Sequence, residues 1–171
     1  MIKSFAKIFG LITILLLTFI LIGIWLPGTW HTEASIEIPA PPQAIFPLIA
    51  DLDRWDEWTQ WSEIQSTTSD PSYGPGAFRT WDNDQYGSGS ITIIESHPEN
   101  TLSYRVVVEK KSEIIGDFNI KPSKIGSTVT WNESGDFGNN PLMGYVAITM
   151  GESQGEQLYE SLDNLKKIID Y

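Results

Sequence analysis

A run of uncharged apolar residues near the N-terminus constrains this 171-residue chain more than any other feature. Residues 8–26 read IFGLITILLLTFILIGIWL, and as an α-helix they would extend about 28 Å, enough to cross the hydrocarbon core of a bilayer. Lys3 and Lys7 precede the run, and the first charge after it is Glu33. By the positive-inside rule, we predict a single-pass anchor with a cytoplasmic N-terminus and an extracytoplasmic domain, either periplasmic or extracellular.

Two other interpretations of this run are weaker. A cleaved signal peptide has a shorter apolar region and a small-residue cleavage site, whereas Trp-Leu-Pro-Gly-Thr-Trp follows here at residues 25–30. A core helix would show a polar face, and this run has none. We therefore favour an uncleaved anchor at residues 8–26, after a short cytoplasmic N-terminus at residues 1–7 and before a linker at residues 27–33 and a domain at residues 34–171.

The charge balance excludes several classes of function. Twenty-two acidic residues oppose eleven basic ones, which gives a formal net charge of −11 at pH 7 and argues against a nucleic acid as partner. An acidic domain is repelled by anionic headgroups, so we expect it to stand off the membrane that anchors it. The chain has no cysteine, which excludes disulfides, thiolate metal sites and thiol nucleophiles.

The hydrophobic patterning of the domain predicts an α+β fold. One strand comes first, two short helices follow, then a series of antiparallel strands, and finally one long helix. Alternation of apolar and polar residues places strands around residues 34–38, 78–81, 89–95, 102–108, 114–120 and 129–131. Helical spacing places helices from Pro42 onward, around residues 53–61, and over residues 155–170, where Leu158, Leu162, Leu165 and Ile169 form one apolar stripe.

Four segments of the domain resemble a known protein group. Residues 40–58 (APPQAIFPLIADLDRWDEW), 87–98, 126–131 and 155–166 resemble, in order and spacing, the polyketide cyclase/dehydrase-like proteins of the START-like, or SRPBCC, superfamily. The resemblance covers residues 34–169. It implies the helix-grip fold, in which a curved antiparallel sheet holds a long C-terminal helix around a hydrophobic cavity. It implies a hydrophobic small molecule or a lipid as partner, and no catalytic residue can be carried over from it. We expect no cofactor.

Aromatic residues and the apolar stripe of the last helix are the candidate cavity residues. Trp55, Trp58 and Trp61 share one helical face, where they either cover the mouth of a cavity or pack in the core. Both interpretations stay open at this point. The complete set of ligand-binding candidates is Trp55, Trp58, Trp81, Tyr104, Phe118, Trp131, Leu158 and Leu162.

Charged residues supply few further candidates. Arg79 and Arg105 could pair with a ligand carboxylate or phosphate if they face inward, although alternation directs Arg105 to solvent. Residues 82–87 begin like a calcium loop but lack oxygen donors at its fifth and twelfth positions, so we predict a solvated turn and no metal site. We expect the two histidines, His31 and His97, to be structural or solvated.

Three functions are compatible with these features. The first is a membrane-anchored binding module for a hydrophobic ligand, which a continuous apolar cavity would favour. The second is a cyclase- or dehydratase-like enzyme, which needs a buried acid–base group such as a carboxylate–histidine or arginine–tyrosine pair. The third is an interaction protein whose vestigial cavity is filled by Trp and Phe side chains. Catalysis is not required by any motif in the sequence.

Overall fold

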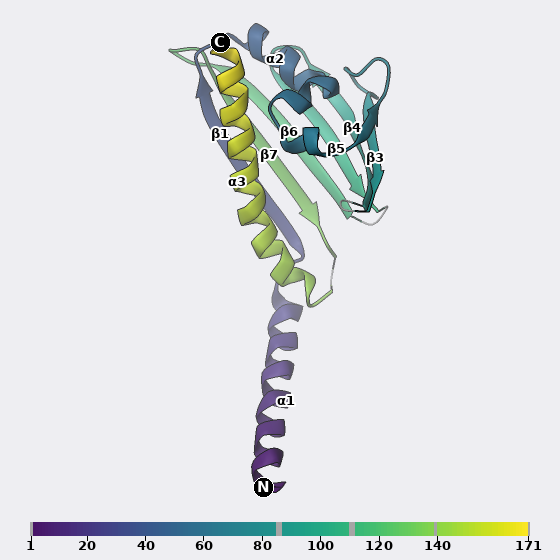
Figure 1. The fold of residues 1–171 in the computed structure, drawn as a ribbon. Helices are drawn as coiled ribbons and strands as arrows, with labels where there is room; N and C mark the ends of the chain where they lie inside the picture. The colour runs from purple at the N-terminus through teal and green to yellow at the C-terminus, as the bar shows by residue number, and fades with distance from the viewer. Residues whose placement is uncertain (1, 85–86, 110–111, 139, 171) are drawn as a thin grey trace.

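Seven strands and the C-terminal helix build the domain, and one further helix precedes it (Figure 1). The computed structural model describes residues 2–84, 87–109, 112–138 and 140–170. In chain order the elements are α1 (Ile2–Trp25), β1 (Thr29–Ile38), α2 (Pro42–Ala50), the 3₁₀ helices η1 (Leu52–Glu57) and η2 (Gln60–Glu63), β2 (Ser66–Thr68), β3 (Phe78–Asn83), β4 (Gly87–His97), β5 (Thr101–Val108), β6 (Ser112–Pro122), β7 (Ser127–Asp136) and α3 (Met143–Ile169). Residues 85 and 86 of the predicted turn between β3 and β4 lie outside the described residues.

The strands form one antiparallel sheet in the order β1-β7-β6-β5-β4-β3-β2. Figure 1 shows α3 running along one face of the sheet beside β1, with α2 near the C-terminal end of α3. Burial alternates along β7, where Ser127, Val129, Trp131 and Glu133 face inward. Since alternate residues of a strand face opposite sides, these four side chains line the face that α3 covers. The α+β helix-grip architecture is confirmed.

The structure extends β1 beyond the predicted strand. The sequence predicts a linker at residues 27–33, but β1 already begins at Thr29. Residues 29–33 pair with residues 132–136 of β7, and their burial alternates as in the rest of the strand. The linker assignment is therefore wrong for residues 29–33, because ladder hydrogen bonds to a distant strand decide where β1 begins.

Helix α3 begins twelve residues earlier than the sequence predicts, at Met143 instead of residue 155. Its first half carries small residues, Gly144, Ala147, Gly151 and Gly155, on the side that meets β1 and the end of α1. A Cβ on Gly155 would lie 2.7 Å from Thr32 Oγ1, so the missing side chain permits close packing on β1. Glycines lower intrinsic helix propensity, and tertiary packing overrides this preference here.

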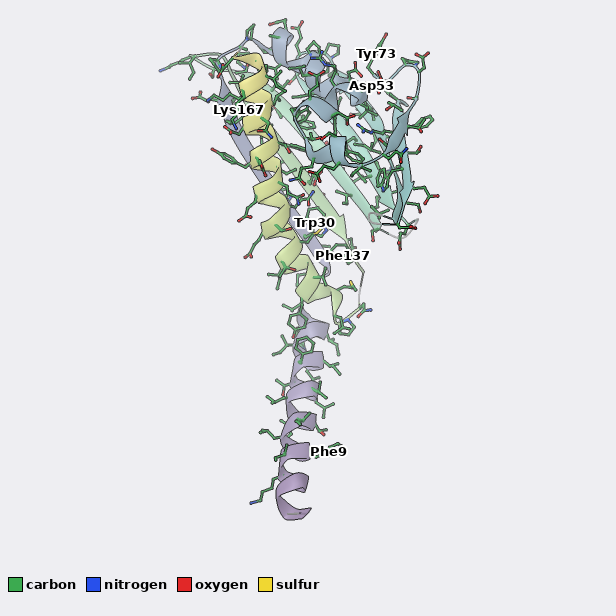
Figure 2. All side chains as sticks on the ribbon, in the orientation of Figure 1. Phe9, Trp30, Asp53, Tyr73, Phe137 and Lys167 are labelled. Atoms are coloured by element: carbon green, nitrogen blue, oxygen red, sulfur yellow. The ribbon has the colours of Figure 1, made fainter. Side chains whose placement is uncertain are left out.

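Helix α1 projects away from the domain, and its side chains point outward all around it (Figures 1 and 2). Its segment Lys7–Trp25 has a mean hydropathy of 2.7 and is long and apolar enough to cross a membrane, a property that signal sequences share. The C-terminal part of α1 contacts the beginning of α3. A Cβ on Gly23 would lie 2.1 Å from the carbonyl oxygen of Pro141, so the two segments meet at backbone distance.

Candidate functional site

A partly open pocket of about 360 Å³ lies between the sheet, the 3₁₀ helices and α3. Trp55 and Trp61 contribute from η1 and η2, and Leu158 contributes from α3. The strands contribute further apolar and aromatic side chains from β4, β5, β6 and β7. Its volume lies within the range of about 300–1,000 Å³ that is usual for small-molecule sites, and its walls are predominantly apolar, as in such sites.

Half of the predicted cavity residues line this pocket: Trp55, Tyr104, Trp131 and Leu158. The Trp55 indole is held in place because its Nε1–H donates to the carbonyl oxygen of Ile49 at 2.8 Å. The ring of Trp55 also meets the ring of Tyr104 edge to face, with centroids 5.2 Å apart. These contacts give the pocket a rigid aromatic wall.

The other half lie outside the pocket lining and pack in the core: Trp58, Trp81, Phe118 and Leu162. Trp58 donates its Nε1–H to the carbonyl oxygen of Leu48 at 3.2 Å, which fixes it beneath α2. Phe118 packs against Trp131 with ring centroids 4.6 Å apart. Trp55 lies in η1 and Trp58 follows directly after its end, and their rings meet with centroids 5.6 Å apart. For Trp58 this agrees with the core-packing interpretation, whereas Trp81, Phe118 and Leu162 were predicted to line the cavity and also lie in the core.

The two candidate arginines do not line the pocket either. Arg105 lies on the exposed side of β5 and pairs with Glu113 at 3.0 Å, as alternation predicts. Arg79 is buried, and its guanidinium contacts Asp56 at 2.6 Å and lies over the ring of Trp61 at 5.2 Å. Arg79 therefore connects β3 to the 3₁₀ helices and positions the Trp61 wall of the pocket.

A chain of hydrogen bonds forms the polar end of the pocket. Trp131 Nε1–H donates to the Tyr104 hydroxyl at 2.7 Å, and the Tyr104 hydroxyl donates to Glu133 Oε1. On the other oxygen, Gln154 Nε2–H donates to Glu133 Oε2 at 2.9 Å. All four side chains line the pocket. The carboxylate is thus the terminal acceptor of a network that joins β5, β7 and α3.

The surroundings of this network raise the pKa of two of its groups, the Glu133 carboxyl and the Tyr104 hydroxyl. Burial raises the pKa of the Glu133 carboxyl, and its hydrogen bonds with Tyr104 and Gln154 offset part of that increase. Burial also raises the pKa of the Tyr104 hydroxyl well above 10, and the neighbouring Glu133 charge adds to the shift. Glu133 is therefore the carboxyl group of the pocket that holds its proton more firmly than an exposed glutamate does, and burial likewise disfavours ionisation of Tyr104.

Gly116 allows Tyr104 to reach Glu133 across an intervening strand. Tyr104 of β5 pairs with Gly116 of β6, and Gly116 pairs with Glu133 of β7. Two strand spacings separate the outer residues by about 9.6 Å, a gap that the two side chains must bridge above β6. A Cβ on Gly116 would lie 2.0 Å from Tyr104 Cζ, so only glycine leaves room for the phenol ring.

Sequence reasoning missed Glu133 and Gln154, although two periodic signals include them. The alternation of Val129 and Trp131 continues to Glu133, and Gln154 precedes Leu158 by one helical turn. Among the described residues, no group of three or more His, Cys, Asp and Glu side chains could hold a metal ion.

Comparisons with known proteins agree with this architecture. A family model described as polyketide cyclase/dehydrase and lipid transport matches residues 29–170. The fold is similar to a Mesorhizobium loti protein (TM-score 0.62, 14% identity, covering 82% of this chain and 96% of that one). It is also similar to a Staphylococcus aureus protein of unknown function (TM-score 0.65, 8% identity, covering 83% and 94%).

A third similar structure is the di-domain ARO/CYC StfQ from the steffimycin biosynthetic pathway, with a TM-score of 0.64 and 11% identity over 83% of this chain and 51% of that one. None of the curated proteins matches the sequence. The likeness to the solved structures shows the fold, and the family model covers most of the chain. This chain belongs to the polyketide cyclase/dehydrase and lipid transport family.

Proposed function

We propose that this protein is a membrane-anchored binding module that holds a hydrophobic small molecule or a lipid between the sheet and α3. The observation that carries the proposal is the open space of about 360 Å³ between rigid walls formed by Trp55, Trp131 and Leu158. Preformed apolar pockets with few polar groups are typical ligand sites. A vestigial pocket would be filled by aromatic side chains, whereas here the space stays open beside them.

The anchoring part of the proposal is supported by α1. Its apolar segment Lys7–Trp25 matches the thickness of a bilayer, and the two lysines near its beginning favour a cytoplasmic N-terminus. The competing interpretation is a cleaved signal sequence. The close fit of Gly23 against Pro141 favours a retained helix, because cleavage would remove one side of this contact.

The domain is proposed to lie nearer the bilayer than its acidic charge suggests. Residues 137–151 contain no charged residue, and the start of α3 exposes Leu142, Val146 and Ile148. These side chains lie beside the end of α1, where headgroups would meet the domain. Apolar contact with the interface favours approach, whereas repulsion between the acidic residues and anionic headgroups is largely screened beyond a Debye length of about 10 Å.

Native mass spectrometry of the full chain, released from nanodiscs, tests ligand binding. Ile114 lines the pocket, so Ile114→Trp should fill it and reduce the amount of a co-purified apolar molecule. The matched control is Ile94→Trp on the exposed side of β4, which should retain the wild-type amount. Absence of any bound molecule in the wild type, or equal occupancy in both variants, would contradict the proposal.

A second candidate function is a cyclase- or dehydratase-like enzyme, because Glu133 is a buried carboxyl with a raised pKa at the polar end of the pocket. Its partner is Tyr104, so the pair differs from the carboxylate–histidine and arginine–tyrosine pairs that the sequence analysis considered. Glu133 could act there as a general acid or base. Once a ligand is identified, the Glu133→Gln variant should still bind it but no longer convert it. If the wild-type protein releases the ligand chemically unchanged, this candidate function is excluded.

A further inference from the structure

We propose that the pocket selects hydrophobic ligands whose polar end donates a hydrogen bond, as an alcohol or an amine does, and rejects ligands that end in a carboxylate or phosphate. Glu133 is the acceptor of that hydrogen bond. The inference rests on the proposed function, because the ligand would occupy the same pocket. It adds the chemistry of the group that the ligand must carry.

The unused acceptor capacity of Glu133 is the first argument. A carboxylate has two oxygens with about four acceptor positions in total. Tyr104 donates to one oxygen and Gln154 donates to the other, which leaves acceptor positions on both oxygens. Since Glu133 lines the pocket, a ligand placed there can supply a further donor. A buried carboxylate gains more from an added donor than an exposed one, because water no longer competes for it.

The charge of the lining is the second argument. Among the described residues, none that lines the pocket is Lys, Arg or His, so no described side chain of the lining can neutralise an anionic ligand group. Arg79 is buried against the ring of Trp61 and is not a lining residue, and its guanidinium pairs with Asp56. A ligand carboxylate or phosphate would therefore lie beside the Glu133 carboxylate in a low-dielectric site, where like charges repel strongly.

The walls of the pocket are the third argument. Beyond the polar end, Trp55, Trp131, Ile91, Val106 and Leu158 present rings and aliphatic groups that fit a compact apolar body. Aromatic faces also attract an ammonium group, so an amine would be as compatible with these walls as an alcohol. Alcohol and amine share the donor that Glu133 requires, and binding measurements distinguish the two.

Four adamantane derivatives with one body and different polar ends test this selectivity: 1-adamantanol, 1-adamantanamine, 1-methoxyadamantane and 1-adamantanecarboxylate. Their affinities are measured at pH 8 on the full chain in phosphatidylcholine nanodiscs, through the emission of the pocket tryptophans, with empty nanodiscs to correct for partitioning. We expect the alcohol, the amine or both to bind at least about ten-fold more tightly than the methoxy and carboxylate compounds, which corresponds to one hydrogen bond to a charged group.

Two variants assign the effect to Glu133. In Glu133→Gln the penalty on the carboxylate probe should fall to about three-fold or less, because a neutral amide can both donate and accept. Glu95→Gln removes the same charge from an exposed position and should keep the wild-type selectivity. Equal affinities for all four probes, or tightest binding of the carboxylate, would overturn the inference and leave the binding function intact. If no probe binds and no ligand co-purifies, the proposed function itself fails.

Discussion

The ring of Tyr145 in α3 stacks on the ring of Phe19 in α1, with centroids 4.3 Å apart and planes inclined by 5°. The Tyr145 hydroxyl also donates to the carbonyl oxygen of Phe19 at 2.8 Å. Phe19 lies within the apolar segment Lys7–Trp25, six residues or about 9 Å before its end. If α1 spans a bilayer, the beginning of α3 must therefore reach the same depth as the outer part of the span.

Single-cysteine labelling tests this depth, since the chain has no native cysteine. In liposomes, a fluorophore at Leu17→Cys should be quenched by deep lipid-borne quenchers and one at Val146→Cys by shallow quenchers. A label at Tyr159→Cys, farther along α3, should not be quenched. Quenching at Leu17 without quenching at Val146 would leave the anchor intact and contradict the contact of α3 with the interface. An unquenched label at Leu17 would contradict the anchor.

Gly116→Ala should break the hydrogen bond between Tyr104 and Glu133. Its new methyl would meet Tyr104 Cζ at 2.0 Å and displace the phenol, with an expected loss of about 1–3 kcal/mol in the free energy of unfolding. Urea melts in mild detergent measure this loss. Gly151→Ala is the control, because its Cβ would meet only the His31 carbonyl oxygen at 3.4 Å and alanine favours a helix. Equal stability of the two variants would contradict the required close approach.

Glu133 should make the stability of the protein depend on pH in a defined direction. Burial raises its pKa above the ordinary value of 4.5, so at pH values just above 4.5 the folded protein binds more protons than the unfolded chain. The free energy of unfolding should then fall as pH rises from 4.5 through the raised pKa, and level off beyond it. The measurement is the difference between wild type and the non-titrating variant Glu133→Gln in urea melts from pH 4 to 8. A constant difference, or one that favours the wild type as pH rises, would refute the assignment.

Shortening two leucines of α3 should distinguish the pocket wall from the solid core. Leu158 lines the pocket and Leu165 does not, although both are buried. Leu158→Ala should lower the free energy of unfolding by about 2 kcal/mol and change the affinity for 1-adamantanol, whereas Leu165→Ala should lose about 3–5 kcal/mol with unchanged affinity. Large and equal losses with unchanged binding in both variants would mean that no pocket exists beside Leu158.

The sequence by itself determined the order of most elements, because each of these follows from a local period. It did not predict the strand β2 (Ser66–Thr68), which is too short to show alternation. Alternation along β7 and the leucine stripe of α3 identify their buried faces without knowledge of any partner. The same reasoning located Trp55, Tyr104, Trp131 and Leu158 on inward faces. It could not separate them from Trp58, Trp81, Phe118 and Leu162, since periodicity identifies a buried face but not where that face leaves space.

Only the tertiary structure decided three features: the polar end of the pocket, the beginning of β1 and the beginning of α3. Residues 29–33 become strand because β7 lies beside them, and the first half of α3 becomes helix because its glycines fit against β1. Glu133 becomes a buried acceptor because the missing side chain of Gly116 lets Tyr104 cross β6. Each of these features depends on contacts between residues far apart in the chain, and the energy of such contacts is set by packing and burial that no local pattern encodes.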